Sequence, residues 1–236
     1  MPAAPRVCDT HANLFNFSHS LPNLTKSFKE RRKIKIVAIG SSSTVGEGSV
    51  VAYPERLAML MRENFRSHRI DVLNRGVGGQ EATTELLRFD PDVLAEEPAL
   101  VIWQVGTNAV YRKEEFNFDE VIAAIGMGLR RLAERHSIDA VIMDSQYTPA
   151  VVDGEKLQLS NDLVARIARV AEDAGANVFR RFDLMRHWVV QDGVSIGDLV
   201  REGDELKLHM SDWATDCVTR ALFEQIKSRL PAEGAS

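Results

Sequence analysis

The sequence lacks the features that mark several specialised classes of protein. No apolar run approaches the roughly 18 residues that a membrane span needs. Over 236 residues the formal net charge is -5, so there is no basic excess of the kind that favours nucleic acid or an anionic membrane surface as the main partner. The content of 44% hydrophobic and 27% charged residues is typical of a globular protein with one large core.

Cysteine is also scarce. Cys8 and Cys217 stand in no CxxC or Cys/His ligand spacing, so the sequence predicts no structural zinc site. Two alternatives remain open: two buried free thiols, or one disulfide between the N-terminal arm and the last helix, which indicates an oxidising compartment. The N-terminus shows no apolar segment of a signal peptide. As it stands, the sequence predicts a cytoplasmic protein, or a periplasmic or secreted one if a leader precedes it.

The chain divides into an arm, one domain and a tail. Residues 1–32 are polar and are predicted to be irregular, with a basic run, KSFKERRK, that is typical of a solvated face. Residues 33–230 form the domain and 231–236 the tail. In the domain, apolar runs typical of strands alternate with helical patterns. The predicted strands are 35–40, 70–76, 99–106, 139–146 and 177–185, and the predicted helices are 54–65, 81–89, 118–136, 155–175 and about 212–229.

This alternation predicts the α/β class, with a parallel sheet and helices on both faces. Ligands of such sheets bind beyond the carboxyl ends of the strands. We therefore expect the loops 40–46, 74–79 and 106–108 to gather at one edge of the sheet, where they form a candidate site.

The first of these loops reads GSSSTVG and has three interpretations. It could cap a helix, hold a phosphate, or carry a nucleophile. A phosphate loop needs the pattern GxxxxGK[ST], but no lysine follows, and Glu47 would repel phosphate. The GVGG stretch at 76–79 does not complete the dinucleotide pattern GxGxxG. A flavodoxin-like nucleotide-binding protein is thus the weaker alternative.

A nucleophile needs a base, and histidine is the usual one near neutral pH. Position in the predicted fold separates the six histidines. Two lie in the arm and two at helix ends, where a histidine usually serves the helix dipole. His187, after the fifth predicted strand, and His209, in the loop before the last helix, are the candidates. The other four are His11, His19, His68 and His136.

Four short sequence blocks follow one another along the chain: GSSSTVG, NRGVGG, VGTN and LHMSDW. Together they resemble the SGNH hydrolases, also called the GDSL esterase/lipase family, from about residue 34 to 230. The resemblance implies a flavodoxin-like, three-layer α/β/α sandwich with a five-stranded parallel sheet. It also implies serine-dependent hydrolysis of carboxylic esters through an acyl-enzyme, with no metal or organic cofactor.

The resemblance assigns roles residue by residue. Aligned on its glycines and threonine, the first block puts the nucleophile at Ser42, while Ser41 stands where the family has aspartate. The oxyanion hole then consists of the Ser42 N–H, the Gly79 N–H and the Asn108 amide, and the base is His209. Without the resemblance, Asn108 and Gly79 would be ordinary turn residues; the coincidence of all four blocks favours the catalytic interpretation.

The acid of the triad is the main departure from the family. The family places aspartate three residues before the histidine, where this chain has Leu206, which cannot accept a hydrogen bond. Three alternatives remain: Asp204 in a bulged loop, Glu205, or a Ser–His dyad. A silent glycan-binding domain is a further alternative. For an active enzyme we expect a small-molecule or carbohydrate ester as partner, with a short acyl group such as acetyl. The sequence predicts no oligomeric state.

Overall fold

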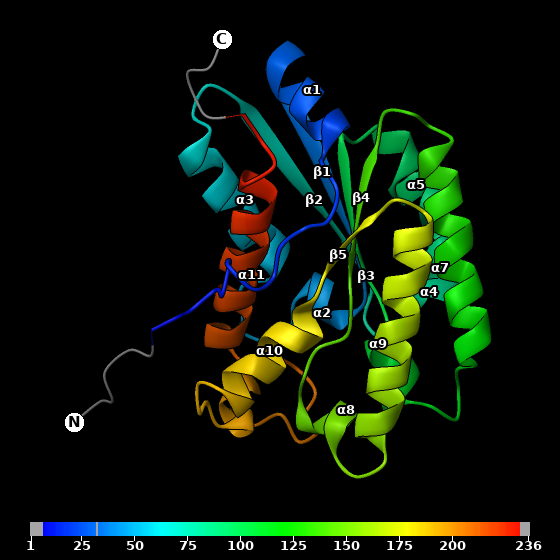
Figure 1. The fold of residues 1–236 in the computed structure, drawn as a ribbon, viewed down its shortest axis with the longest axis vertical. Coiled ribbons are helices and arrows are strands. Elements are labelled where there is room, and N and C mark those ends of the chain that lie inside the picture. Colours follow the sequence, from blue (N-terminus) through cyan, green and yellow to red (C-terminus); the bar gives the residue numbers. More distant parts are fainter. Residues whose placement is uncertain (1–6, 32, 232–236) are drawn as a thin grey trace.

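The computed structural model describes residues 7–31 and 33–231. Its centre is a five-stranded sheet, parallel throughout, with the strand order β2-β1-β3-β4-β5 (Figure 1). This is the sheet that the sequence predicts. The strands are β1 (Lys33–Gly40), β2 (Arg69–Gly76), β3 (Leu100–Gln104), β4 (Asp139–Met143) and β5 (Asn177–Phe179).

Helices cover both faces of the sheet (Figure 1). On one side α3 packs against α11, and on the other α7 packs against α4 and α9. The three-layer sandwich is therefore confirmed. The α-helices are α1 (Pro22–Glu30), α2 (Ser42–Val45), α3 (Tyr53–Asn64), α4 (Ala82–Glu85), α5 (Phe89–Asp92), α6 (Thr107–Tyr111), α7 (Phe118–Ala133), α8 (Pro149–Val152), α9 (Lys156–Asp173), α10 (Arg181–Val190) and α11 (Asp212–Lys227), and the 3-10 helices are η1 (Leu86–Arg88), η2 (Leu94–Glu96) and η3 (Ile196–Leu199).

The core lies between the layers. All five residues of β3 are buried, as expected for a central strand covered on both faces. Trp103 of this strand packs edge-on against Phe89, with ring centroids 4.6 Å apart. The pairing of β1 with β2 sets Gly40 opposite Gly76, so both strands end at one level.

The predicted strand 177–185 is wrong beyond Phe179, because α10 begins at Arg181. The buried side chains Phe182, Met185 and Trp188 recur at a spacing of three, which suits one face of a helix and not a strand. The helix predicted over 81–89 is divided into α4, η1 and the start of α5.

The arm is also more ordered than predicted. Residues 22–30 form α1, with a proline in its first turn, a position that suits the fixed φ angle of proline. Leu24 and Phe28 are buried while Lys26 is exposed, which agrees with the prediction of a solvated basic face. The Leu24 N–H donates to Asp139 at 2.8 Å. The described part of the arm, residues 7–31, thus packs into the core. Residues 1–6 and 32 of the arm and 232–236 of the predicted tail lie outside the described residues.

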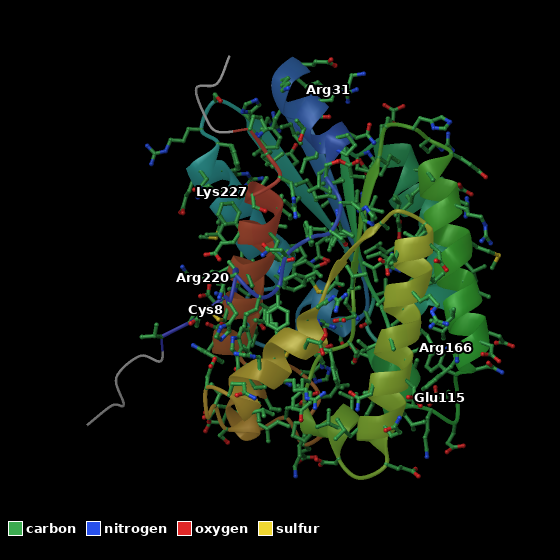
Figure 2. All side chains as sticks on the ribbon, viewed as in Figure 1. Cys8, Arg31, Glu115, Arg166, Arg220 and Lys227 are labelled. Atoms are coloured by element: carbon green, nitrogen blue, oxygen red, sulfur yellow. A yellow bond between two sulfur atoms is a disulfide. The ribbon has the colours of Figure 1, made fainter. Side chains whose placement is uncertain are left out.

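A disulfide between Cys8 and Cys217 joins the arm to α11, with the two Cα atoms 5.5 Å apart. Figure 2 shows Cys8 beside α11. Of the two alternatives for the cysteines, the structure has the disulfide. Within the described residues, no helix combines the length and apolar character needed to cross a membrane.

Candidate functional site

The serine loop turns sharply where β1 ends. Ser42 is the first residue of α2, so its N–H has no acceptor within the helix. The turn brings α2 against the end of β2: a Cβ on Gly76 would lie 2.2 Å from the Val45 nitrogen. Only glycine allows this approach, which explains the glycine at this position.

Gln104, the last residue of β3, fixes the serine loop through hydrogen bonds. Its Oε1 accepts hydrogen bonds from the Ser41 N–H at 3.0 Å, the Ser41 hydroxyl at 3.0 Å and the Thr44 hydroxyl at 3.2 Å. Ser41 therefore serves the loop's own framework in place of the family's aspartate. Ser43 donates to Gln146 at 2.8 Å. The serines on either side of Ser42 are thus committed to structural hydrogen bonds.

His209 lies in the loop before α11, and Asp204 is its carboxylate partner. The distance from His209 Nδ1 to Asp204 Oδ1 is 3.1 Å. The other carboxylate oxygen accepts the N–H of Leu208 at 2.8 Å and that of His209 at 2.7 Å. Lys207 adopts a left-handed conformation with φ of 52°, which lets the chain bulge and bring Asp204 back to the ring five positions later.

The environment of Asp204 favours its charged form. Burial alone would raise the pKa of this carboxyl. The hydrogen bonds from the backbone and ring of His209 and from the Leu208 N–H outweigh burial, and they hold the pKa of Asp204 below its usual value. A carboxylate, not a neutral acid, therefore faces the His209 ring at neutral pH.

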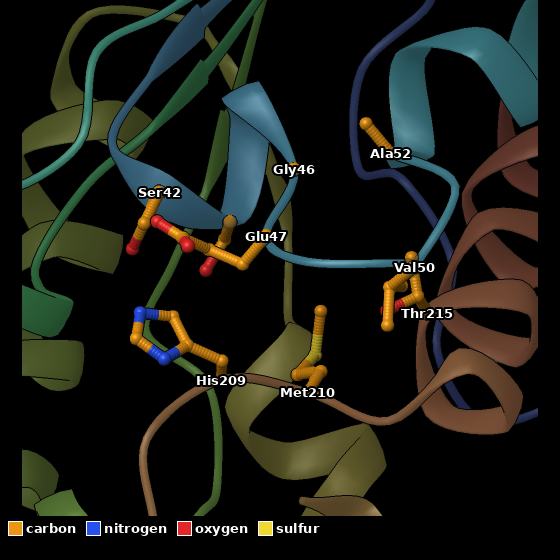
Figure 3. Close-up of a pocket in the computed structure, with 9 residues that line it drawn as sticks. Ser42, Gly46, Glu47, Val50, Ala52, His209, Met210 and Thr215 are labelled. Carbon is orange, nitrogen blue, oxygen red and sulfur yellow. The ribbon is translucent and has the colours of Figure 1, made fainter. Parts of the chain in front are cut away.

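One pocket contains both Ser42 and His209, although they come from opposite ends of the chain. Figure 3 shows the ring of His209 directed toward the side of the pocket where the Ser42 hydroxyl lies. Glu47 contributes a carboxylate to the same wall. The lining residues are Ser42, Ser43, Gly46, Glu47, Val50, Ala52, His209, Met210 and Thr215.

Gly79 and Asn108 lie at the same edge of the sheet. Gly79 has φ of 77°, a conformation that glycine adopts without strain, and its carbonyl accepts a hydrogen bond from Arg112. Asn108, in α6, donates through Nδ2 to the carbonyl of Gln80 at 2.8 Å. This bond fixes the plane of the amide and leaves its second N–H available for a ligand.

Glu81 links the loop of Gly79 to the loop of Asn108 through hydrogen bonds. Its buried carboxylate accepts the N–H groups of Ala82, Gly106 and Ala109, at 3.0, 2.8 and 3.0 Å. Burial raises the pKa of Glu81, and the N–H donors counter only part of the increase. Glu85, one turn further on and also buried, has a pKa well above the usual value because of burial and the nearby Glu81.

Gln146, after β4, connects the serine loop to the histidine loop. Its Oε1 accepts from Ser43, and its Nε2 donates to the carbonyl of Leu208. The side chain is buried. One amide therefore fixes the separation of the two loops that carry Ser42 and His209.

The structure brings Ser42, His209 and Asp204 together, whereas Gly79 and Asn108 lie at the same edge of the sheet without lining the pocket. His187 lies in the last turn of α10 and lines no part of the pocket, and Glu205 is exposed. Sequence reasoning missed Gln104, Glu81 and Gln146. Gln104 and Gln146 carry a signal in the sequence, a polar side chain at or just past the end of an apolar run, whereas Glu81 follows a glycine-rich stretch and carries none.

The five-stranded parallel sheet with helices on both faces is the fold that the SGNH hydrolases share. A family model described as the Non-GDSL lipase-like family matches residues 7–231, and the chain belongs to this family. The name agrees with a first block that reads Gly-Ser-Ser-Ser. The match begins in the arm, which agrees with the packing of α1 on the sheet.

Solved structures share the fold. An acetylxylan esterase, Axe2 from Geobacillus stearothermophilus, superposes with a TM-score of 0.68 at 19% identity, covering 85% of this chain and 97% of its own. LAE5, an α/β hydrolase from the metagenome of Lake Arreo, Spain, gives 0.69 at 18% identity, covering 84% and 97%. Catalytic mutants of Axe2, with a serine, an aspartate or a histidine replaced by alanine, are also similar. No curated protein sequence matches the chain significantly.

Proposed function

We propose that the protein is a serine esterase that removes short acyl groups, such as acetyl, from carbohydrate. One observation carries the proposal: Ser42 lines the same pocket as His209, whose Nδ1 lies 3.1 Å from the buried side chain of Asp204. With Nδ1 donating to the carboxylate, Nε2 has the free lone pair that a general base needs.

The reaction has two halves. The Ser42 oxygen attacks the acyl carbon and its proton passes to His209 Nε2, which then protonates the departing alcohol. In the second half, His209 takes a proton from water, the hydroxide attacks the acyl-enzyme, and the Ser42 oxygen regains the proton. Asp204 keeps the ring in the correct tautomer and stabilises the imidazolium in both halves.

The oxyanion of each tetrahedral intermediate is held by three donors. These are the Ser42 N–H, the Gly79 N–H and the second N–H of the Asn108 amide. Removing one such donor typically costs about 3 kcal/mol of transition-state stabilisation. The hydrogen bond from Asn108 to Gln80 and the Glu81 carboxylate support the proposal, because they fix the donors before substrate binds.

The pocket wall favours a small, uncharged ester. Val50, Ala52 and Met210 form its apolar part, suited to a short acyl chain. Glu47 adds a carboxylate that would repel anionic substrates and can accept hydrogen bonds from sugar hydroxyls. The similarity to Axe2, an acetylxylan esterase, supports the same substrate class.

Hydrolysis of p-nitrophenyl esters of increasing chain length tests the proposal. We expect kcat/KM to be highest for acetate, and acetylated xylo-oligosaccharides to release acetate. Ser42→Ala and His209→Ala should each lower kcat roughly 10,000-fold or more, while His136→Asn, on the exposed surface, serves as the control. If Ser42→Ala hydrolyses the acetate as fast as the wild type, the proposal is wrong. If the wild type binds these oligosaccharides without turnover, it is a binding domain.

A further inference from the structure

A second group of histidine and carboxylate side chains lies where the arm crosses α10. It consists of His11, His187 and Asp192, and one ligand atom from each lies within 4.8 Å of the ligand atoms of the other two. None of the three lines the pocket of Ser42 and His209. We call this group the His–His–Asp cluster.

The two imidazoles share one carboxylate. His11 Nε2 is 2.7 Å from Asp192 Oδ2, and His187 Nε2 is 3.9 Å from Asp192 Oδ1. The two rings meet edge-on, with centroids 4.3 Å apart. Zinc bonds to such atoms at about 2.0–2.2 Å, which places tetrahedral ligands about 3.3 Å from each other. To reach that separation, the His11–Asp192 contact of 2.7 Å lengthens and the His187–Asp192 contact of 3.9 Å shortens, each by about 0.6 Å. The proton between His11 Nε2 and Asp192 leaves when the ion binds.

The backbone around His11 is fixed independently of the cluster. The disulfide of Cys8 anchors the arm three residues earlier, and the Trp188 indole donates to the Asp9 carbonyl at 2.8 Å. The His11 N–H donates to the Asp9 side chain at 2.9 Å, and His11 itself has φ of 46°. An ion that binds here therefore meets a largely preorganised site and orders little additional chain.

His187 and Asp192 are fixed by the end of α10. The N–H groups of Gln191 and Asp192 both donate to the His187 carbonyl, at 2.8 and 3.3 Å. This turn sets the carboxylate beside the ring of the same helix terminus. The arm then supplies the third ligand from a distant part of the sequence.

A second carboxylate stands behind His11. Asp9 Oδ1 is 3.6 Å from His11 Nδ1, on the ring edge away from Asp192. A carboxylate that accepts a hydrogen bond from this nitrogen orients the imidazole of metal-binding histidines and increases its basicity. Asp9 takes up this position when the contact shortens to hydrogen-bond distance. The side chains of His11, His187 and Asp192 are 12%, 25% and 31% exposed, so an ion keeps access to water as a fourth ligand.

We propose that the His–His–Asp cluster binds one divalent transition-metal ion of the zinc class, which joins the arm to α10. Two imidazole nitrogens and one carboxylate suit Zn²⁺ and its neighbours and not Mg²⁺ or Ca²⁺, which prefer oxygen. The ion lies outside the esterase pocket, so its role is to hold the arm against the domain. The proposal does not depend on the proposed function.

Isothermal titration of the tag-free, disulfide-bonded full chain with ZnCl2, after dialysis against EDTA, tests the proposal. We expect one equivalent to bind, and His187→Ala or Asp192→Asn to weaken the affinity more than about 100-fold. Asp9→Asn, which keeps the oxygen acceptor but loses the charge, should weaken it about 10-fold. His136→Asn is the matched control. Zinc in excess should raise the Tm of the wild type but not that of His187→Ala.

Three outcomes would overturn the proposal. The wild type binds no zinc; or His187→Ala and Asp192→Asn, with Tm values near the wild type in EDTA, bind it unchanged; or His209→Ala alone abolishes binding, which would place the ion in the esterase pocket. A cobalt titration separates these cases further, because the visible spectrum of bound Co²⁺ should change in His187→Ala and not in His209→Ala.

Discussion

The molecule contains two histidine–aspartate pairs that have similar contact distances and differ in burial and in the groups next to them. His209 Nδ1 lies 3.1 Å from Asp204, and His11 Nε2 lies 2.7 Å from Asp192. The Asp204 side chain is 4% exposed and also accepts two backbone N–H groups. The Asp192 side chain is 31% exposed and faces a second imidazole.

We infer that the third partner decides the chemistry of such a pair. At His209 the third partner is the Ser42 hydroxyl in the same pocket, which in the proposed reaction transfers its proton to the imidazole. At His11 the third partner is another imidazole, so the group brings three ligand atoms close together and offers no nucleophile. Distance and residue type alone would not separate the two pairs.

The largest expected effect is at the first pair. Asp204→Asn keeps an acceptor oxygen but removes the charge that stabilises the imidazolium, so we expect kcat for p-nitrophenyl acetate to fall about 10,000-fold. Glu205→Gln, one residue away and exposed, should stay near the wild type. A silent Asp204→Asn would leave a Ser–His dyad, and the contrast between the two pairs would disappear.

The second pair depends on the anchored arm. Replacing Cys8 and Cys217 by serine should lower the free energy of unfolding by about 2–5 kcal/mol, measured by urea denaturation of the full chain. Thiol titration of the wild type under denaturing, non-reducing conditions should find no free thiol. Two free thiols per chain would contradict the disulfide and with it the anchoring of His11.

We infer that Gln146 positions the serine loop relative to His209 of the first pair. Gln146→Met keeps the volume but loses both hydrogen bonds. We expect kcat to fall about 10- to 100-fold with KM nearly unchanged, since small misplacements of reacting groups are costly. Gln158→Met, on the exposed face of α9, is the control. If KM rises 10- to 100-fold while kcat is unchanged, Gln146 acts in substrate binding instead.

The smallest effect concerns stability and pH. The folded-state pKa of Asp204 lies below its unfolded value, so its contribution to stability is present above about pH 4 and is lost as the pH falls through the folded-state pKa. The Tm difference between the wild type and Asp204→Asn should therefore be largest near pH 7 and shrink toward pH 3. A difference that is constant with pH would show that the carboxylate carries no such shift.

Much of the fold could be predicted because it follows from local patterns. The apolar runs of β1 to β4 and the amphipathic helices α3, α7, α9 and α11 each carry their own periodicity. The stretch after β5 is wrongly predicted as strand up to residue 185, because the apolar positions 182 and 185 continue the short apolar run of that strand. The order of the arm depends on contacts such as Leu24 with Asp139, which lie far apart in the sequence.

Parts of the candidate site could also be predicted from the sequence, and other parts could not. The loops of Ser42, Gly79 and Asn108 follow directly from strand ends, so the sheet alone brings them together. The partner of His209 could not be chosen among three alternatives, because the choice depends on the left-handed conformation of Lys207. The His–His–Asp cluster was invisible in the sequence, since the disulfide and the packing of the arm on Trp188 bring His11 to α10.

The central claim is that Ser42, and neither serine beside it, is the nucleophile. Labelling with a fluorophosphonate probe followed by peptide mapping tests it most directly. We expect one adduct per chain, on the Ser42 hydroxyl, which is retained in Ser43→Ala and absent in Ser42→Ala. An adduct on Ser41 or Ser43, or labelling that persists in Ser42→Ala, would contradict it.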